Sequence, residues 1–570
     1  MTKNILLLFC FFFITHFVNA QSISLNGKFT DWTGTTITTD ATADGNGIDL
    51  KGFSVTNDDE NLYIRLITNA AFNLADSNSL YVNIDADNNA STGFSTYGIG
   101  SELGWRFGSK YGFYYHGASL KDTVFASNIK FVALPTFKSD TFEIAISRAA
   151  VVGTPAISLF SSNTIKLNFV NGITGGDAMP NSGSTYTYTF TNTHHSDFGA
   201  IDISKCNSNY IRLMEYNVLN DGLKDNARLG SFERIFKAIN PDVIVLCECW
   251  NTTATQAKTL LNTWLPLGGS ASWNCYKETT AGIIIASRSS IQGASKITFG
   301  RTTAAYINLP SNYLTDLLVI GTHLAAGNDA DSLRQSEADN MIQYITKMKA
   351  GTTSVPVLVP ANTPFVIAGD FNMVNYSSPL NTILTGNIAN TAVFGTAPPP
   401  DWDNKPLTSI NALVADRNMT YTWRNQSETA KWWPGKLDYI IHTNTNIKVK
   451  KSFVLQTEMM SVGRLTQYGL QANDNLIASD HLPSVTDLEI PMTTIITPTL
   501  QWNGSINTAW ENPANWNCSM VPDQNSNVVI PSVAPNFPVI NNSTEVRSIQ
   551  SNSNSSISVQ PGINVKLNGQ

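Results

Sequence analysis

The chain has 570 residues, which is too long for one ordinary domain and predicts three or four folded units. Hydrophobic residues make up 42% of the sequence and charged residues 14%, a composition that is typical of globular proteins and excludes a disordered chain. The formal net charge is −7 and there is no long run of Lys or Arg, so no broad basic surface for nucleic acid is predicted, although a local patch or a bound metal can supply a positive field.

Residues 1–20 have the layout of a cleaved secretory signal. Lys3 is followed by the apolar run ILLLFCFFFI and then by a small residue before Gln21. A structural helix is the alternative interpretation. The run is too short for a comfortable membrane span, and no later stretch of about 20 apolar residues follows it. The sequence therefore predicts a secreted protein, extracellular or at the cell surface, with no transmembrane segment.

Residues 21–192 consist of short apolar runs separated by clusters of Asn, Asp, Gly and Ser. Examples are NLYIRLIT (61–68), SLYVNID (79–85) and TFEIAIS (141–147). Period-2 alternation between turn clusters predicts a β-sandwich. The segments LNGKFTDW (25–32) and IDADNNASTGF (84–94) resemble those of secreted carbohydrate-binding sandwich modules of the family 9 type, which implies a glycan as partner.

One loop of this region is rich in oxygen ligands. Asp85, Asp87 and Asn89 occupy alternate positions before Thr92 and Gly93, so their side-chain oxygens could converge on Ca²⁺. An ordinary polar hairpin loop is the alternative interpretation.

The pattern changes after a polar linker predicted over residues 193–207. In residues 208–491, buried-looking runs alternate with helical patterns over 224–239 and 331–348, which predicts an α/β domain. The runs are IRLMEYNV (211–218), DVIVLCE (242–248), LLVIGTH (317–323), FVIAGD (365–370) and LDYIIH (437–442). Residues 492–570 have short strands and Asn/Ser turns, which predict a small all-β module. This module resembles Trp- and Asn-rich C-terminal modules of secreted bacterial proteins, which implies a role in surface attachment or export.

Several apolar strands of the middle region end in a polar or ionisable residue. They end at Asn217, Glu248, His323 and Asp370, and Asp438 lies near the start of another strand, with Asp480 and His481 in a later loop. Asp and Glu seldom lie at the edge of a core without a partner, so we expect these residues to form one site. The alternative is that each of them caps a strand or a turn by itself.

The residue types in this set are those that cleavage of a phosphoester needs. Mg²⁺ or Mn²⁺ prefers carboxylate and amide oxygens, and an ion between Glu248 and Asp480 could neutralise charge on a phosphate. In GDFN (369–372), Asp370 and Asn372 emerge on one face of an extended segment. One of them could deprotonate a water while the other donates a hydrogen bond to a phosphoryl oxygen.

His481 and Asp438 could form a pair in which the carboxylate orients the imidazole. A carboxylate beside the ring fixes the tautomer and favours the charged form, which suits a role next to a phosphate. Arg334, on the helix predicted after THL, could bind phosphate bidentately, and a salt bridge on the helix surface is the alternative.

The motifs of the middle region resemble, in order and spacing, those of the endonuclease/exonuclease/phosphatase family, which includes deoxyribonuclease I, apurinic endonucleases and neutral sphingomyelinases. They are YNVLNDG (216–222), VIVLCECW (243–250), IGTHL (320–324), GDFN (369–372), GKLDYII (435–441) and ASDHLP (478–483). The resemblance implies a four-layer α/β sandwich, in which two β-sheets pack face to face with helices outside.

The resemblance also implies roles for these residues. Asn217 and Glu248 would contact metal or phosphate, Asp370 and Asn372 would handle the nucleophilic water, Asp480 would assist the metal, and His481 with Asp438 would act on the scissile phosphate. His323 matches a second catalytic histidine of the deoxyribonuclease and sphingomyelinase branches. Glu278 could orient His323, or it is a solvated surface glutamate. One departure is Cys247, where the family usually has Gln.

The leading functional hypothesis is an extracellular, monomeric nuclease that depends on a divalent metal. A sphingomyelinase or phospholipase C-like enzyme is the alternative within the same chemistry, and a surface adhesin on a degenerate hydrolase scaffold is an alternative of another class. Trp402, Trp432 and Trp433 lie in Pro/Asn-rich loops, where they would stack on bases, enter a lipid interface or pack in a core.

Overall fold

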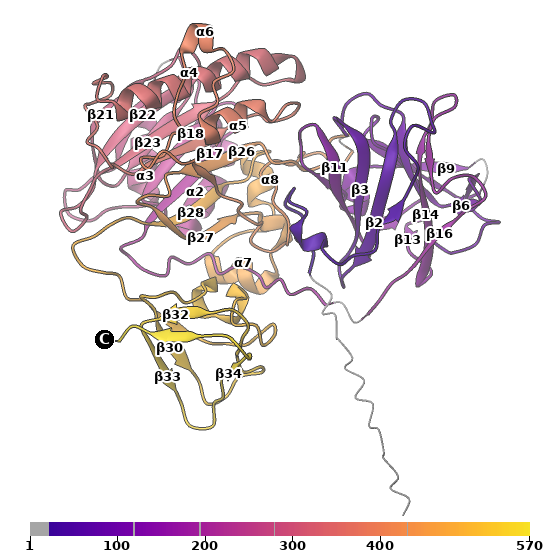
Figure 1. Cartoon of the computed structure of the whole chain (residues 1–570). Helices are drawn as coiled ribbons and strands as arrows, with labels where there is room; N and C mark the ends of the chain where they lie inside the picture. The colour runs from indigo at the N-terminus through magenta and orange to yellow at the C-terminus, as the bar shows by residue number, and fades with distance from the viewer. Residues whose placement is uncertain (1–21, 118–119, 193–194, 279, 430, 570) are drawn as a thin grey trace, which may run out of the picture.

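The computed structural model describes residues 22–117, 120–192, 195–278, 280–429 and 431–569. The predicted secretory signal, residues 1–20, lies outside these ranges. Within them, no helix has both the length and the apolar character that crossing a membrane requires. Figure 1 shows a β-sandwich on the right, a larger part with sheets and helices on the left, and a small β part below it that carries the C-terminus.

The N-terminal sandwich is built from two antiparallel sheets. The first has the order β1-β2-β3-β11-β10, with β1 (Thr38–Thr39), β2 (Leu50–Asn57), β3 (Asn61–Phe72), β11 (Ser139–Ser147) and β10 (Val132–Leu134). The second has the order β15-β14-β4-β7-β8-β9, with β15 (Ala178–Met179), β14 (Thr164–Asn171), β4 (Leu80–Asp85), β7 (Leu103–Arg106), β8 (Tyr111–Tyr115) and β9 (Lys121–Val124), and β16 (Tyr186–Thr189) pairs with β14. Shorter elements are β5 (Phe94–Thr96), β6 (Ile99–Ser101), α1 (Ala126–Ile129), β12 (Val151–Val152) and β13 (Ile157–Ser158).

Both faces of the first sheet are buried, and for different reasons. Ile64 and Ile144 point into the sandwich core, whereas their neighbours Tyr63 and Ala145 belong to a second apolar cluster. This cluster also contains Met419 and other residues of the middle part of the chain. Because successive side chains of a strand point to opposite faces, the sandwich uses one face for its own core and the other for its contact with the middle domain.

The middle domain contains two six-stranded sheets. The first has the order β19-β20-β18-β17-β28-β27, with β19 (Asn274–Lys277), β20 (Ile284–Ser287), β18 (Val243–Cys247), β17 (Ile211–Asn217), β28 (Ser484–Glu489) and β27 (Lys448–Val454). The second has the order β21-β22-β23-β24-β26-β25, with β21 (Ser290–Lys296), β22 (Thr302–Asn308), β23 (Leu317–His323), β24 (Phe365–Asp370), β26 (Asp438–His442) and β25 (Thr408–Ser409).

The two sheets share one apolar core, and helices cover their outer faces. Leu213 and Val245 of the first sheet lie in the same cluster as Val319 and Val366 of the second. The first sheet's outer face packs on α2 (Asn226–Ile239), α3 (Ala254–Trp264), α7 (Val462–Tyr468) and α8 (Asp474–Ala478), and the second's on α4 (Asp331–Lys349), α5 (Ser378–Thr385) and α6 (Thr391–Phe394). The predicted α/β class is confirmed, and α2 and α4 are the helices predicted over 224–239 and 331–348.

The C-terminal part is all β, as predicted. Its strands pair in parallel in three small groups, β29-β30-β33, β31-β34 and β32-β35. They are β29 (Thr499–Gln501), β30 (Asn527–Ile530), β31 (Val539–Ile540), β32 (Thr544–Val546), β33 (Ser548–Ser551), β34 (Ser558–Val559) and β35 (Val565–Leu567). Trp502, Trp510 and Trp516 are fully buried and form the centre of its core.

The loop before β26 joins the middle domain to the sandwich. Trp433 belongs to the sandwich core, with ring centroids 5.2 Å from Phe131 and 6.4 Å from Trp105. Its neighbour Trp432 is 42% exposed. Trp402 donates through Nε1 to Thr363 O at 2.6 Å. Trp433 and Trp402 therefore have structural roles, and Trp432 alone of these three is open to solvent.

Replacing Trp433 with Ala should detach the sandwich from the loop. We expect the unfolding free energy of the sandwich to fall by about 3 kcal/mol or more, because a large buried side chain leaves a cavity. Calorimetry of the full chain measures the loss, and faster proteolysis of the 424–437 loop should accompany it. Trp432→Ala is the matched control and should cost less than about 1 kcal/mol; equal melting of the two variants would contradict the assignment.

Candidate active site

The strand register brings the predicted residues to one edge of the two sheets. In the first sheet, β17 and β18 are parallel and Asn217 pairs with Cys247, the residue before Glu248. In the second sheet, β23 and β24 are parallel, and His323 pairs with Asp370. Asp370 also pairs with Asp438 of β26 across an antiparallel ladder. The ends of four strands thus place the polar groups together, which caps acting separately would not do.

Asn217 connects the two sheets through its side-chain amide. Its Nδ2 donates to Glu248 Oε1 at 3.1 Å and to Asp370 Oδ2 at 3.1 Å. The other Glu248 oxygen accepts from the backbone N–H of Asn220 at 2.8 Å. Glu248 has a φ of 61°, a left-handed conformation that costs a residue with a side chain about 1 kcal/mol or more. The strain places its carboxylate against the Asn217 amide.

Gly369 is required before Asp370 because of the backbone of the neighbouring strand. Its φ is 152°, and a Cβ atom at this position would lie 1.7 Å from Thr322 O. The backbone of β23 therefore approaches this position too closely for any side chain. On the other side of Asp370, Asn372 donates its backbone N–H to Asp370 Oδ1 at 2.9 Å and its Nδ2 to Leu324 O at 3.1 Å.

His481 is held between two carboxylates. Its Nδ1 lies 2.9 Å from Asp438 Oδ2, and its Nε2 lies 3.7 Å from Asp370 Oδ2. Burial opposes a charge on the ring, but the carboxylates of Asp438 and Asp370 outweigh it and raise the pKa of His481 to about 10. His481 is therefore an imidazolium at neutral pH, as its pairing with Asp438 predicted.

His323 faces the same carboxylate in the opposite protonation state. Its Nε2 lies 3.6 Å from Asp370 Oδ2, and its ring lies 5.8 Å from that of Trp250. Burial, helped by the positive charges of Arg301 and His481, lowers the pKa of His323 well below its usual value. The two histidines thus form one charged and one neutral imidazole around Asp370, a separation of pKa values that is typical of acid–base pairs.

The orientation of His323 does not come from Glu278. His323 Nδ1 has no hydrogen-bond partner among the residues that the structure describes. Glu278 Oε2 accepts from the backbone N–H groups of Thr280 and Ala281. The surface interpretation of Glu278 agrees with these bonds.

Asp370 itself has a perturbed acidity. Burial raises its pKa to about 7, with a lowering contribution from His481 and a raising one from Asp438. Glu215, inside β17, was not predicted as a site residue. Its two carboxyl oxygens are buried without a hydrogen-bond partner in the described part of the chain, and burial together with Asp438 and Asp370 raises its pKa well above the usual value. A lone Glu within an apolar strand was the signal for it.

Asp480 has the features of a cation ligand. Its Oδ2 accepts from Trp423 Nε1 at 3.0 Å, whereas its Oδ1 is buried and lacks a hydrogen-bond partner in the described ranges. A buried carboxylate oxygen without a hydrogen-bond partner fits a divalent ion. In the close group formed by Asp370, Asp438 and His481, in contrast, the imidazolium offsets part of the negative charge.

Two residues that sequence reasoning missed hold the Asp480 loop in place. Arg228 of α2 donates to Val218 O at 2.6 Å and, through Nε, to Ala478 O at 2.9 Å. Ser479 Oγ donates to Asn217 O at 2.7 Å. The bonds to Ala478 and from Ser479 join segments more than 200 positions apart, so no local pattern could have revealed them.

Arg334 does not reach the site, which corrects its predicted role in phosphate binding. Its side chain is fully buried, and its Nη1 donates to Ala325 O and to Gly327 O, each at 2.7 Å. Its Nη2 lies 2.6 Å from Asp331 Oδ1. The guanidinium is thus used to shape the loop after β23.

The sandwich contains a carboxylate cluster at the predicted calcium loop, and one further residue joins it. Ligand oxygens of Asp85, Asp87 and Glu102 lie within 4.8 Å of one another. Asn89 lies beside them, because its backbone N–H donates to Asp85 and Asp87, and its Oδ1 accepts from Ser91 N at 3.1 Å. Glu102, on the loop before β7, was not predicted.

The charge of His481 should depend on Asp438. In Asp438→Asn the pKa of His481 should fall below its wild-type value of about 10, because burial then meets less opposing charge. The stability gained from this raised pKa is fully present below the ordinary pKa of 6.5 and is lost as pH rises through about 10, so the variant should lose it at neutral pH. Histidine NMR across this range measures the change.

The matched control for this measurement is Asp122→Asn, which removes the carboxylate 2.7 Å from His116 of the sandwich. It should leave the titration of His481 as in the wild type. An unchanged His481 titration in Asp438→Asn would contradict the assigned pairing.

Comparison with known proteins places this site in context. The family model described as the Endonuclease/Exonuclease/phosphatase family matches residues 214–481. No curated protein matches the chain.

Among solved structures, the chain is similar to D. rerio TDP2 complexed with single strand DNA product (15% identity, 50% of this chain and 100% of that chain, TM-score 0.32). It is also similar to the human Nocturnin catalytic domain with bound sulfate anion (16%, 50% and 96%, TM-score 0.32). A third similar structure is ANGEL2, a 2',3'-cyclic phosphatase (16%, 50% and 96%, TM-score 0.33).

Proposed function

Since residues 214–481 match the model of the Endonuclease/Exonuclease/phosphatase family, we propose that this chain is a divalent-metal-dependent phosphodiesterase that acts as an extracellular nuclease. The observation that carries the proposal is the continuous contact from Glu248 through Asn217 and Asp370 to His481. Together with Asp438, which contacts His481, these residues come from five separate stretches of the chain. All five side chains lie at the same edge of the two sheets.

The residues present fit a cation near Asp480. Mg²⁺ or Mn²⁺ held by Glu248 and Asp480 would neutralise the charge that develops on the phosphate. Asn217 supports this ion indirectly, because its amide orients Glu248 and Asp370 through Nδ2. Cys247 lies beneath the site and donates its thiol to Thr322 O at 3.4 Å, so it substitutes for the usual Gln in packing.

The protein groups then divide the proton transfers of hydrolysis. Asp370, with Asn372 beside it, accepts the proton of the attacking water as the new P–O bond forms. His481, kept charged by Asp438, donates through Nε2 to the phosphate and gives its proton to the leaving oxygen as that P–O bond breaks. His323 is neutral and lies beside Asp370, where it can accept a hydrogen bond from the same water.

A sphingomyelinase or phospholipase C-like activity would use the same groups on another phosphodiester. A non-catalytic adhesin is supported less well, because a degenerate site would not retain every acid and base in mutual contact. The five cysteines of the described residues are all free. A secreted protein with free cysteines must fold without a disulfide. We further propose that the protein is a secreted monomer whose sandwich binds a glycan. The proposed domain limits are 21–192, 208–491 and 492–570.

Turnover should depend on both the metal and His481. The full chain is incubated with plasmid DNA, sphingomyelin or a chromogenic phosphodiester, with Mg²⁺ and then with EDTA. We expect DNA cleavage that EDTA abolishes and that His481→Ala lowers by about 100-fold or more, because a general acid is lost. His116→Ala, at a histidine of the sandwich, is the control and should retain activity. Turnover of sphingomyelin alone would favour the lipid alternative, and none on any substrate would refute the enzyme.

We also propose that the sandwich binds Ca²⁺ at Asp85, Asp87 and Glu102. Asp85 and Glu102 are buried, and each has one carboxylate oxygen without a hydrogen-bond partner in the described residues. Three negative groups at this distance repel one another unless a cation is bound, and oxygen ligands of this kind suit Ca²⁺.

Calcium should therefore stabilise the sandwich. At a concentration 100 times the Kd, we expect about 2.7 kcal/mol of added stability by mass action, seen as a higher midpoint in calorimetry. Glu102→Gln should abolish the shift, whereas Asn89→Ala should keep it because the Asn89 Oδ1 already accepts a hydrogen bond from Ser91 N. A wild-type midpoint that does not respond to calcium would count against the site.

A further inference from the structure

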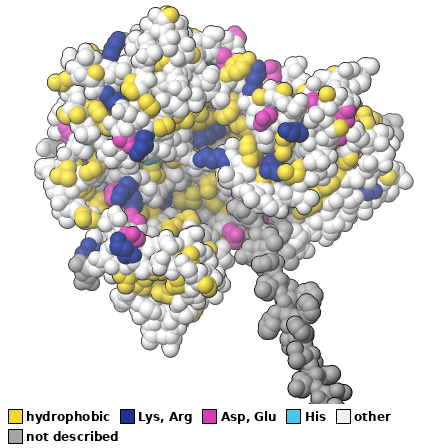
Figure 2. Space-filling model, in the orientation of Figure 1, with side chains coloured by type: hydrophobic (Ala, Val, Ile, Leu, Met, Phe, Trp, Pro, Cys, Tyr) yellow, Lys and Arg dark blue, Asp and Glu magenta, His cyan; other side chains and the backbone are white. Residues whose placement is uncertain are grey.

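A pocket of 260 Å³ lies between the sandwich and the middle domain, next to the candidate active site. The sandwich contributes Leu74 and Pro135 to its lining, and the middle domain contributes Val374, Trp423 and Leu437. Asn73 Nδ2 donates to Val374 O at 2.7 Å and Thr136 Oγ1 accepts from Lys436 N at 2.9 Å, so both walls are held together by hydrogen bonds. Figure 2 shows a wider hollow between the two parts, in which hydrophobic and Lys or Arg side chains are exposed; none of the Lys or Arg residues that the structure describes lines the pocket itself.

The segments that carry the catalytic groups continue into the wall of this pocket. Leu437 directly precedes Asp438, and Val374 follows two residues after Asn372. Trp423 donates its indole N–H to Asp480 and forms a backbone bridge with His481. The pocket therefore lies beside the place where the phosphate would bind, within reach of a group attached to it.

The lining is aromatic and uncharged. It includes Trp432 and Trp433 besides Trp423, and no Asp, Glu, Lys or Arg is among the described residues that line it. Trp433 is committed to the sandwich core, but Trp432 is 42% exposed and available to stack. Lys110 Nζ lies 4.3 Å from the centre of the Trp432 ring, which places a positive charge at the rim.

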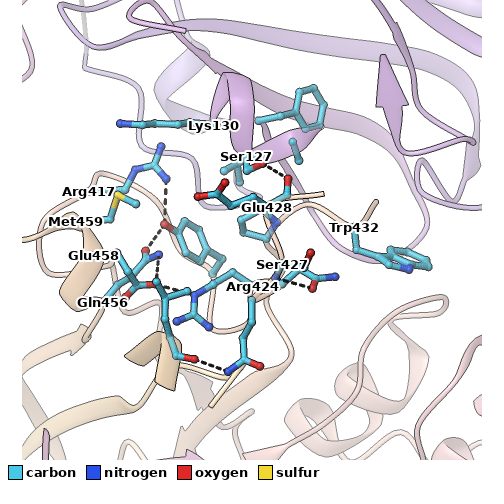
Figure 3. Close-up of a pocket in the computed structure, with 18 residues that line it drawn as sticks. Ser127, Lys130, Arg417, Arg424, Ser427, Glu428, Trp432, Gln456, Glu458 and Met459 are labelled. Carbon is cyan, nitrogen blue, oxygen red and sulfur yellow. Dashed lines mark hydrogen bonds and ion pairs between the residues drawn. The ribbon is translucent and has the colours of Figure 1, made fainter. Parts of the chain in front are cut away.

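A second cavity, of 290 Å³, lies on the other side of the same loop and has a different character (Figure 3). Its lining contains charged side chains, among them Arg417, Arg424 and Glu458, and Arg424 lies 2.8 Å from Glu458. Trp432 lies apart from these groups at the edge of the view. The uncharged pocket is thus the one suited to a neutral planar ligand.

We propose that the pocket binds the nucleobase next to the scissile phosphate of a single-stranded nucleic acid, with Trp432 as stacking platform. This inference rests on the proposed phosphodiesterase function. Base faces stack on aromatic side chains while cations at the rim attract the backbone, which matches Trp432 and Lys110. A base must leave the duplex stack to enter such a pocket, hence the preference for a single strand.

The charge and size of the pocket disfavour a lipid. A choline headgroup is cationic, and Lys110 already presents a cation to the Trp432 ring with no carboxylate in the lining to offset it. The volume of 260 Å³ is below the range of about 300–1,000 Å³ of pockets for drug-sized ligands, so it suits one base rather than acyl chains.

The test uses the full chain and pairs of end-labelled oligothymidylates that differ by one abasic residue in the centre. Cleavage at each phosphate is mapped, and a small chromogenic diester, methyl 4-nitrophenyl phosphate, reports the chemistry. We expect the wild type to cut next to the abasic residue about tenfold or more slowly than at the same phosphate of the intact strand. Trp432→Ala should remove this difference by slowing cleavage of the intact strand.

Two further variants complete the design. Ala75→Trp, which fills the pocket from the sandwich side, should have the same effect as Trp432→Ala. Phe94→Ala, at a ring that is also 42% exposed but lies outside the pocket, should behave as the wild type. Circular dichroism and the chromogenic diester check that each variant is folded and competent.

The outcomes separate this inference from the proposed function. Equal cleavage of intact and abasic strands by the wild type, with the diester still hydrolysed, would overturn the base pocket and leave the phosphodiesterase standing. Loss of sphingomyelin turnover in Trp432→Ala without any effect on oligonucleotides would also overturn it, in favour of a lipid. Absence of turnover on every substrate would overturn the proposed function itself.

Discussion

A buried carboxylate needs hydrogen-bond donors or positive charge around it, and the requirement of Asp370 organises the whole site. Asp370 lies on the second sheet, yet it receives the amide of Asn217 from the first sheet and faces the imidazoles of His481 and His323. Removing water from such a group is costly unless these partners stay in place. The partners of Asp370 come from both sheets, so they stay in place only while the two sheets pack face to face.

This constraint also explains why the two histidines differ. Both rings are buried, but only His481 has a second carboxylate, Asp438, in direct contact. The same burial that lowers the pKa of His323 is outweighed at His481 by two negative charges. A charged and a neutral imidazole can thus coexist around one carboxylate at neutral pH.

The sandwich is part of the architecture around the site. An apolar cluster joins its first sheet to the middle domain, and Trp433 crosses from one core into the other. Because the loop that carries Trp433 also leads into Asp438, the contact with the sandwich helps to position the catalytic strand β26. A carbohydrate-binding module on a flexible linker would not have this effect, so the sandwich has a structural role whatever ligand it binds.

The sequence by itself predicted the α/β class and the two long helices, since these depend on local periodicity. Its residue types and its resemblance to a phosphoesterase family also predicted most of the polar groups that the structure brings together at one edge of the sheets. Only the tertiary structure decided that Glu102 joins Asp85 and Asp87 in a carboxylate cluster, that Arg334 is buried, and that Glu215 and Trp423 adjoin residues of the candidate site. The physical reason is that a side chain's partners come from segments far away in the chain. Burial and charge pairing depend on those partners, and the residue pattern of a strand does not indicate which distant segment will pack against it.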